Sequence, residues 1–231
     1  MEAIFKVITS KVISEFNRFP RVIGLLISRP KELFSSIDNH QSTFLKALSF
    51  SAVISFLITL LSIPSFKTNH VEVESLLLTL DVFINIILLV IYSLITYISA
   101  RIFFGRGGVL RTISAFLYVS PLLVLIKLLE IPTRIVRDKE LLAGALTPST
   151  VENMTLAINS NPYLLVSELL VGVGYIWFVC VLFLLLKTVH NFGFMRALLS
   201  SGLTMWLISL GVYWIQRPVI HVLLNAFSLN K

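Results

Sequence analysis

The stretch LLLTLDVFINIILLVIYSLITYISARIFF, residues 76–104, contains just two charged side chains, Asp81 and Arg101. An α-helix needs about 20 apolar residues to cross the hydrocarbon core of a bilayer, and this stretch exceeds that length. In lipid, every backbone N–H and C=O must find a partner in the protein, and the stretch lacks the two-residue alternation of a barrel strand. It therefore predicts a transmembrane helix.

Four further stretches have the same character: residues 45–66, 109–130, 163–187 and 197–215. The whole chain is 56% hydrophobic and 13% charged, with a mean hydropathy of +0.90. Soluble domains carry about 25% charged residues. The sequence thus predicts an all-α, polytopic membrane protein with five transmembrane helices, preceded by one or two amphipathic cytoplasmic helices. Residues 1–44 form the predicted cytoplasmic segment, 45–215 the transmembrane domain and 216–231 an external tail.

The basic residues predict an orientation. With a cytoplasmic N-terminus, twelve of the 19 Lys and Arg residues fall on the inner side, including the close set Arg101, Arg106 and Arg111. Short cytoplasmic loops carry an excess of Lys and Arg, whereas long loops carry little orienting information. Four of the remaining basic residues lie in or beside the long stretch 131–162. We expect the N-terminus inside and the C-terminus outside.

The first 19 residues show the pattern of a helix that lies on a membrane surface. Apolar residues recur every fourth position, and basic residues lie elsewhere on the helical wheel. The predicted anchor consists of Ile4, Phe5, Ile8, Val12, Phe16, Lys6, Lys11 and Arg18. Pro20 is predicted to end this helix, and a second short element follows over 22–37. A docking helix for a partner protein needs the same amphipathicity, so both uses remain open.

The connections predict local features. Gly105, Arg106, Gly107 and Gly108 form a tight inside turn; they are not a phosphate loop, because helices flank the turn on both sides and no Gly-Lys-Ser/Thr ending is present. Pro121 should kink the third span. One or two short interfacial helices are expected within residues 131–162.

Ionisable residues inside the spans mark a candidate site, because each costs about 2.5 to 3.5 kcal/mol at a helix centre. The predicted intramembrane network consists of Asp81, Asn85, Lys127, Glu130 and Glu168. Counting inward from the outer ends puts Asp81, Lys127 and Glu168 at similar depth, so Lys127 should lie within salt-bridge or water-bridged reach of at least one acid. The network is either a structural lock between helices or part of a proton or cation pathway.

Other chemistry has little support in the residues. The four histidines fall in four different segments and Cys180 is the single cysteine, so neither a metal site nor a cofactor is expected. No nucleophile motif occurs, which argues against an enzyme. The net charge of +7 is spread over the span ends, so nucleic acid is not an expected partner.

Four features in order resemble the Yip1 family of five-span membrane proteins. They are ISRPKELFSSI at 27–37, FFGRGGVLRTISAFLYVSP at 103–121, a Trp-containing fourth span at 175–186, and HNFGFMRAL at 190–198. The resemblance implies a cytoplasmic N-terminus and an external or lumenal C-terminus. Eukaryotic relatives are associated with vesicle trafficking and Rab GTPase partners. This chain lacks the long polar N-terminal region of the trafficking members, which argues against a GTPase partner.

The expected function is that of a non-catalytic membrane scaffold or adaptor. It would organise membrane lipids or other membrane proteins, including further copies of itself. The alternative is a small-solute or ion transporter, or a transport-accessory subunit, that uses Asp81, Lys127 and Glu168. The expected location is a prokaryotic plasma membrane, with a eukaryotic ER or Golgi membrane as the alternative.

Overall fold

The computed structural model describes residues 2–68, 73–143 and 148–227. Within these ranges the chain is helical, and five helical stretches are long and apolar enough to cross a membrane. These spans are Gln41–Thr68, Ser75–Ile102, Val109–Arg137, Pro162–Val189 and Phe194–Ile220. The predicted fold class is confirmed: the protein is an all-α, multi-pass integral membrane protein.

Individual helices subdivide the spans. In chain order they are α1 (Glu2–Ser28), α2 (Pro30–Ser35), α3 (Gln41–Leu60), α4 (Ile63–Thr68), α5 (Ser75–Ile102), α6 (Val109–Val119), α7 (Pro121–Ala143), α8 (Pro148–Ser160), α9 (Pro162–Val189), α10 (Phe194–Gly211), a π-helical turn η1 (Val212–Gln216) and α11 (Arg217–Ala226).

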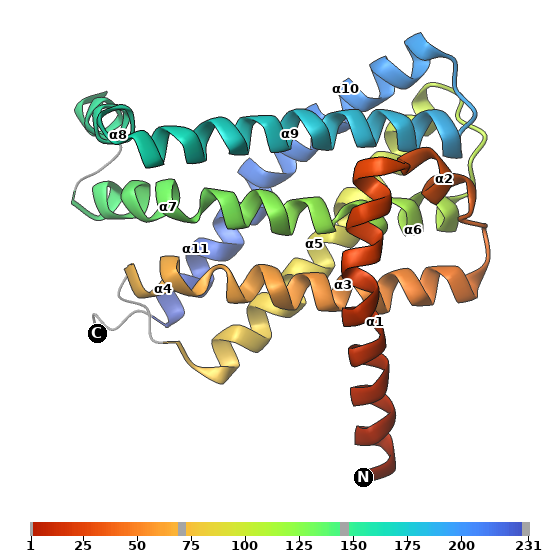
Figure 1. Cartoon of the computed structure of the whole chain (residues 1–231), viewed down its shortest axis with the longest axis horizontal. Helices are drawn as coiled ribbons and strands as arrows, with labels where there is room; N and C mark the ends of the chain where they lie inside the picture. The colour runs from red at the N-terminus through yellow and green to blue at the C-terminus, as the bar shows by residue number, and fades with distance from the viewer. Residues whose placement is uncertain (1, 69–72, 144–147, 228–231) are drawn as a thin grey trace.

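The bundle has two distinct ends (Figure 1). We call one the turn end; it gathers the segment 36–40, the glycine turn 103–108 and the short connection 190–193. We call the other the loop end; it holds α4, α8 and the end of α11. Because successive spans run in opposite directions, every odd span leaves the turn end and every even span returns to it.

The third span lies at the centre. Of its most apolar 18-residue window, 72% is buried, against 22% to 44% for the other four spans. Every residue of α6 from Thr112 to Val119 is buried. α6 packs against α3, α5 and α9, while α7 packs mainly against α9. The remaining spans therefore present broad apolar faces outward, as expected of helices in contact with lipid.

Pro121 divides the third span into two helices, α6 and α7. Proline lacks an N–H and so leaves the carbonyl four residues earlier without its helical partner. That carbonyl belongs to Leu117, and the hydroxyl of Ser120 donates to it at 2.6 Å. The side chain thus replaces the missing backbone hydrogen bond at a fully buried position.

The N-terminal helix differs from the prediction at Pro20. α1 continues through Pro20 to Ser28, and the chain breaks at Arg29, before Pro30 opens α2. Both Pro20 and Phe16 are exposed, so water or lipid headgroups can solvate the carbonyl that Pro20 frees. α1 runs across the spans, packs against α3 and α7 near its C-terminus, and projects beyond the bundle at its N-terminus (Figure 1).

Two predicted boundaries also move outward. α7 continues from the membrane through the charged segment to Ala143, which the sequence placed in an external loop. The last span continues as α11 to Ala226, so the predicted tail 216–231 begins as helix. α8 is confirmed as a short helix between the third and fourth spans. Charged residues at helix ends obscure where a helix stops, because hydropathy reports the lipid boundary instead.

Candidate functional site

A cavity of about 310 Å³, lined by more apolar than polar residues, lies among all five spans. Its lining includes Ile58 from α3, Asp81 from α5, Lys127 from α7, Tyr175 from α9 and Met205 from α10. The polar members of the lining are Ser62, Asp81, Asn85, Tyr92, Lys127, Glu130, Arg134, Tyr175 and Gln216. Four of the five predicted network residues therefore face one cavity, while Glu168 does not line it.

Asp81 connects the first two spans. Its carboxylate accepts a hydrogen bond from the Thr59 hydroxyl at 2.6 Å and another from the Asn85 amide at 3.0 Å. The Asn85 amide lies 3.3 Å from the Thr59 hydroxyl as well. Asp81 is only 6% exposed. A buried carboxylate is costly unless hydrogen-bonded, so these contacts explain how it is tolerated.

Lys127 forms no direct ion pair with the described acids, which is one of the two contacts predicted for it; the water-bridged contact stays a prediction. Among the described residues, no ion pair includes Lys127, although it shares the cavity with Asp81 and Glu130. Glu168 instead takes a guanidinium: Nη2 of Arg137 donates to both of its oxygens at 2.7 Å. Nη1 of Arg137 also lies 3.5 Å from Glu130. The single predicted network is therefore two separate groups.

The continuation of α7 explains this correction. The hydropathy pattern predicts that the third span ends at Glu130 and that Arg137 lies in a loop. Lys127 is therefore the base that the sequence offers to Glu168. In the structure Arg137 lies about two turns beyond Glu130 on the same helix, next to α9. The Arg137–Glu168 pair and a hydrogen bond from the Ser167 hydroxyl to the Leu129 carbonyl join α7 to α9.

Tyr92 and Gln216, which both line the cavity, form a hydrogen bond that the sequence did not predict. The hydroxyl of Tyr92 on α5 donates to Oε1 of Gln216 at 2.8 Å. Gln216 is the last residue of the π-helical turn η1 and the first residue of the predicted external tail. Gly211 allows this approach, because a Cβ there would lie 3.2 Å from a Tyr92 ring carbon. A polar residue just after an apolar span was the one available signal.

The cavity is asymmetric. Phe116 and Phe178 line it and pack edge to face, with ring centroids 6.5 Å apart. Asp81, Lys127, Glu130 and Arg134 come from the halves of the second and third spans that lie nearer the loop end. The arrangement can hold a small polar or charged group against Lys127.

The turn end contains a second polar centre, which the sequence identified only as a chain reversal. Nδ1 of His190 accepts a hydrogen bond from the backbone N–H of Gly107 at 3.1 Å, so Nε2 carries the proton of the neutral ring. Nε2 lies 3.0 Å from the Thr112 hydroxyl, which in turn donates to the Gly108 carbonyl at 3.0 Å. Burial, with the nearby charges of Arg101 and Arg111, lowers the pKa of His190 to about 4.

Close packing explains the glycines of the turn. A Cβ on Gly105 would lie 2.5 Å from His190 Nδ1, and one on Gly107 would lie 2.8 Å from the Val189 carbonyl. A Cβ on Gly108 would lie 2.4 Å from the Asn39 side chain. The turn is thus more than a reversal: its glycines let His190 and Asn39 approach the backbone.

The predicted surface anchor is described only in part. The side chains of Ile4, Phe5, Lys6, Ile8, Lys11 and Val12 lie outside the described residues, although α1 spans these positions. Phe16 is 42% exposed. The Arg18 guanidinium lies 4.9 Å above the centre of the Tyr118 ring, so this base contacts the protein. Val22 and Leu26 are buried against the bundle.

No group of three or more His, Cys, Asp or Glu residues in the described part of the chain could hold a metal ion.

The comparisons with known proteins identify the family. Comparison with curated proteins and with solved structures finds no match. The family model for the Yip1 domain matches residues 23–215, from the end of α1 to η1. The match covers most of the chain and contains all four sequence features noted above, so the chain belongs to the Yip1 family of membrane proteins.

Proposed function

We propose that the protein is a non-catalytic membrane scaffold or adaptor that organises lipids or partner membrane proteins. Its cytoplasmic surface is formed by α1 and the turn end, and its location is a prokaryotic plasma membrane. The observation that carries the proposal is the position of α1: an amphipathic helix crosses the spans, is fixed at one end and projects beyond the bundle at the other (Figure 1).

The C-terminal part of α1 is attached by specific contacts. Val22 and Leu26 are 2% and 0% exposed, and Arg18 lies over the Tyr118 ring. These contacts set the direction in which the rest of the helix leaves the bundle. The segment 4–16 retains a stripe of apolar residues beside basic ones. A helix of this kind binds a membrane surface or the groove of a partner.

The depth at which α1 crosses the bundle suits a membrane surface. Spans of about 28 residues are about 42 Å long, some 12 Å more than the hydrocarbon core of a bilayer. If the excess is shared equally, each end extends about 6 Å beyond the core. Tyr118 lies nine residues into α6, about 13 Å from the turn end. α1 therefore crosses about 7 Å inside the core boundary, within the roughly 5 to 10 Å typical of interfacial helices.

Transport is the second candidate, and the cavity around Lys127 favours it. A positively charged side chain without an ion pair among the described residues, inside a membrane cavity of about 310 Å³, could receive an anionic solute. A transport path also needs access from both sides of the membrane. The charged lining is confined to the half nearer the loop end, so we rank transport below the scaffold.

Purification of the full-length chain in mild detergent tests the proposal. The variant Ile8→Glu/Val12→Glu places charge on the apolar stripe of α1, and Ser14→Glu places it on the opposite side of the helix as the matched control. We expect the wild-type chain and Ser14→Glu to co-purify the same lipids and membrane proteins, and the double variant to lose them while keeping its melting temperature.

Two results would contradict the scaffold. In the first, the double variant retains every co-purifying lipid and protein. In the second, the wild-type chain in vesicles carries a solute or ion across the membrane and Lys127→Met abolishes this flux, which would favour transport.

A further inference from the structure

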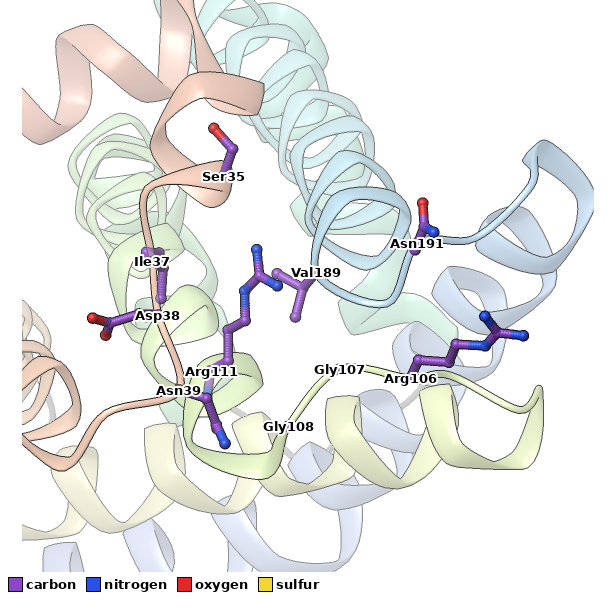
Figure 2. A pocket seen from close by; sticks show the side chains of 10 residues that line it. All are labelled: Ser35, Ile37, Asp38, Asn39, Arg106, Gly107, Gly108, Arg111, Val189 and Asn191. Carbon is purple, nitrogen blue, oxygen red and sulfur yellow. The ribbon is translucent and has the colours of Figure 1, made fainter.

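The turn end contains a cavity of about 570 Å³ that the scaffold proposal does not use (Figure 2). It lies between the segment 35–39, the glycine turn, the start of α6 and the end of α9. The residues that matter for its chemistry are Asp38, Asn39, Arg106, Gly107, Gly108 and Arg111. A volume of this size lies within the range of about 300 to 1,000 Å³ typical of ligand sites.

Arg111 is the main charged group of the cavity. Its guanidinium extends into the space between the segment 35–39 and Val189 (Figure 2). Its Nε is buried and has no hydrogen-bond partner. Among the described residues, no ion pair includes Arg111 or Arg106. Because a buried guanidinium nitrogen without a partner is costly, the side chain is suited to an anionic ligand.

The single carboxylate of the cavity is already engaged. Asp38 accepts a hydrogen bond from the Thr43 hydroxyl. This hydrogen bond lowers the pKa of Asp38, so the group is charged at neutral pH. Figure 2 shows the carboxylate on the outer side of the segment 36–40, directed away from Arg111. It therefore leaves the guanidinium available instead of neutralising it.

The walls of the cavity are held in place by side-chain contacts. Asn39 Oδ1 accepts a hydrogen bond from the backbone N–H of Arg111 at 3.1 Å, which ties the segment 36–40 to the first turn of α6. His190 holds Gly107 and Thr112. Arg101 donates to the Gly105 carbonyl at 2.8 Å. A rigid site loses little conformational entropy when a ligand binds.

The position of the cavity indicates the source of the anion. The ends of all five spans meet here, so the cavity lies at the level of the lipid headgroups. Arginine forks bind phosphate oxygens in pairs, and basic pockets between transmembrane helices bind phosphorylated headgroups. We propose that the turn-end cavity binds the phosphate group of an anionic lipid through Arg111, since Figure 2 shows the Arg106 side chain directed away from Arg111. The site requires neither α1 nor a protein partner, so it extends the scaffold proposal and can fail independently.

Lipid binding by the purified full-length chain tests the site. Phosphatidic acid, phosphatidylcholine and inorganic phosphate are each added in a neutral detergent, and binding is followed by the melting temperature and by native mass spectrometry. We expect phosphatidic acid to bind and phosphatidylcholine, whose choline offsets the phosphate charge, to bind at least tenfold more weakly. Arg111→Gln should weaken phosphatidic acid binding by about tenfold.

Arg196→Gln is the matched control, because Arg196 is exposed at the same end of the bundle and does not line the cavity. It should bind phosphatidic acid like the wild-type chain. The comparison of the two lipids uses the wild-type chain, so the test stays valid even if Arg111→Gln fails to fold. Competition by inorganic phosphate at equal affinity would support the site and assign it to free phosphate. Equal binding of phosphatidic acid by the wild-type chain and a folded Arg111→Gln would overturn the proposal, as would equal binding of the two lipids by the wild-type chain.

Discussion

The two ends of the bundle handle polar groups differently. At the turn end a neutral histidine, an asparagine and three glycines hold the backbone, and two arginines have no ion pair among the described residues. At the loop end the buried Asp81 carboxylate is hydrogen-bonded to Thr59, and the partly exposed Arg137 and Glu168 form an ion pair.

The difference between the two ends indicates a structural role for the charges of the loop end and a binding role for those of the turn end. The paired charges of the loop end connect helices: Asp81 joins α5 to α3, and Arg137 joins α7 to α9. At the turn end the hydrogen bonds instead fix the walls of a cavity. The guanidinium groups of Arg106 and Arg111 form no ion pair with the described residues. Substitutions at the loop end should therefore change stability, and substitution of Arg111 should change binding.

The largest expected effect on stability is at Gly105. Gly105→Ala places a Cβ 2.5 Å from His190 Nδ1 and 2.8 Å from the Ala100 carbonyl, so the backbone must move. We expect a loss of about 3 kcal/mol, measured as the free energy of unfolding by steric trapping in detergent. Gly202→Ala is the control: it lies within α10 with nothing within 4 Å of the new Cβ. Equal stability of Gly105→Ala and the wild-type chain would remove the packing argument.

His190 should make stability depend on pH. Burial lowers its pKa from 6.5 to about 4, so the unfolded chain binds a proton that the folded chain does not. Stability from this group is complete above about pH 6.5 and falls as the pH drops toward 4. Between pH 7 and pH 5 the expected loss is about 2 kcal/mol. Thermal unfolding across this range should show a smaller dependence for His190→Gln. An identical pH profile for both proteins would show that His190 is not a buried neutral group.

The Arg137–Glu168 pair should show a smaller coupling. Its side chains are 34% and 41% exposed, so solvent screens the bidentate contact. A double-mutant cycle with Arg137→Gln and Glu168→Gln should give a coupling free energy of about 1 kcal/mol. Glu130 lies 3.5 Å from the same guanidinium, so a cycle with Glu130→Gln and Arg137→Gln should give a smaller coupling free energy. A coupling free energy of zero between Arg137 and Glu168 would show that this ion pair does not stabilise the packing of α7 against α9.

Lys127 gives the smallest expected effect. The sequence predicts that Lys127 lies within salt-bridge or water-bridged reach of an acid, for which Lys127→Met would be destabilising because the acids would be left uncompensated. The structure shows no such pair among the described residues, so the loss should stay below about 1 kcal/mol. The same unfolding measurement decides the matter. A loss of about 3 kcal/mol or more would restore the original network.

The sequence predicted the parts of the fold that follow from hydropathy. All five spans are found, because a run of apolar residues in lipid has one stable backbone conformation. The ends of α7 and α11 were placed too early, since their polar continuations resemble loop residues in composition. That error removed Arg137 and Gln216 from the candidate site, and with them the partners of Glu168 and Tyr92.

The site was less predictable than the fold. The spacing of Asp81 and Asn85 predicts that they share one face of a helix, and the Asn85 amide donates a hydrogen bond to the Asp81 carboxylate. Contacts between distant segments, such as His190 with Gly107 or Asn39 with Arg111, depend on how spans pack and have no local pattern. The sequence predicts a tight turn at the glycines. The close approach of the His190 ring, which excludes a Cβ at Gly105 and Gly107, is seen only in the structure.

The central claim is that five spans separate two unlike ends, with the turn end and α1 facing the cytoplasm. Single cysteines at Arg106 and Ser160, introduced into a Cys180→Ala chain, test it most directly, since both positions are exposed and lie at opposite ends. A membrane-impermeant thiol reagent added to intact cells should label the cysteine at 160, and the cysteine at 106 should react only after the cells are opened. Labelling of both positions from the same side would contradict the five-span arrangement, and labelling of position 106 alone in intact cells would place the turn end outside.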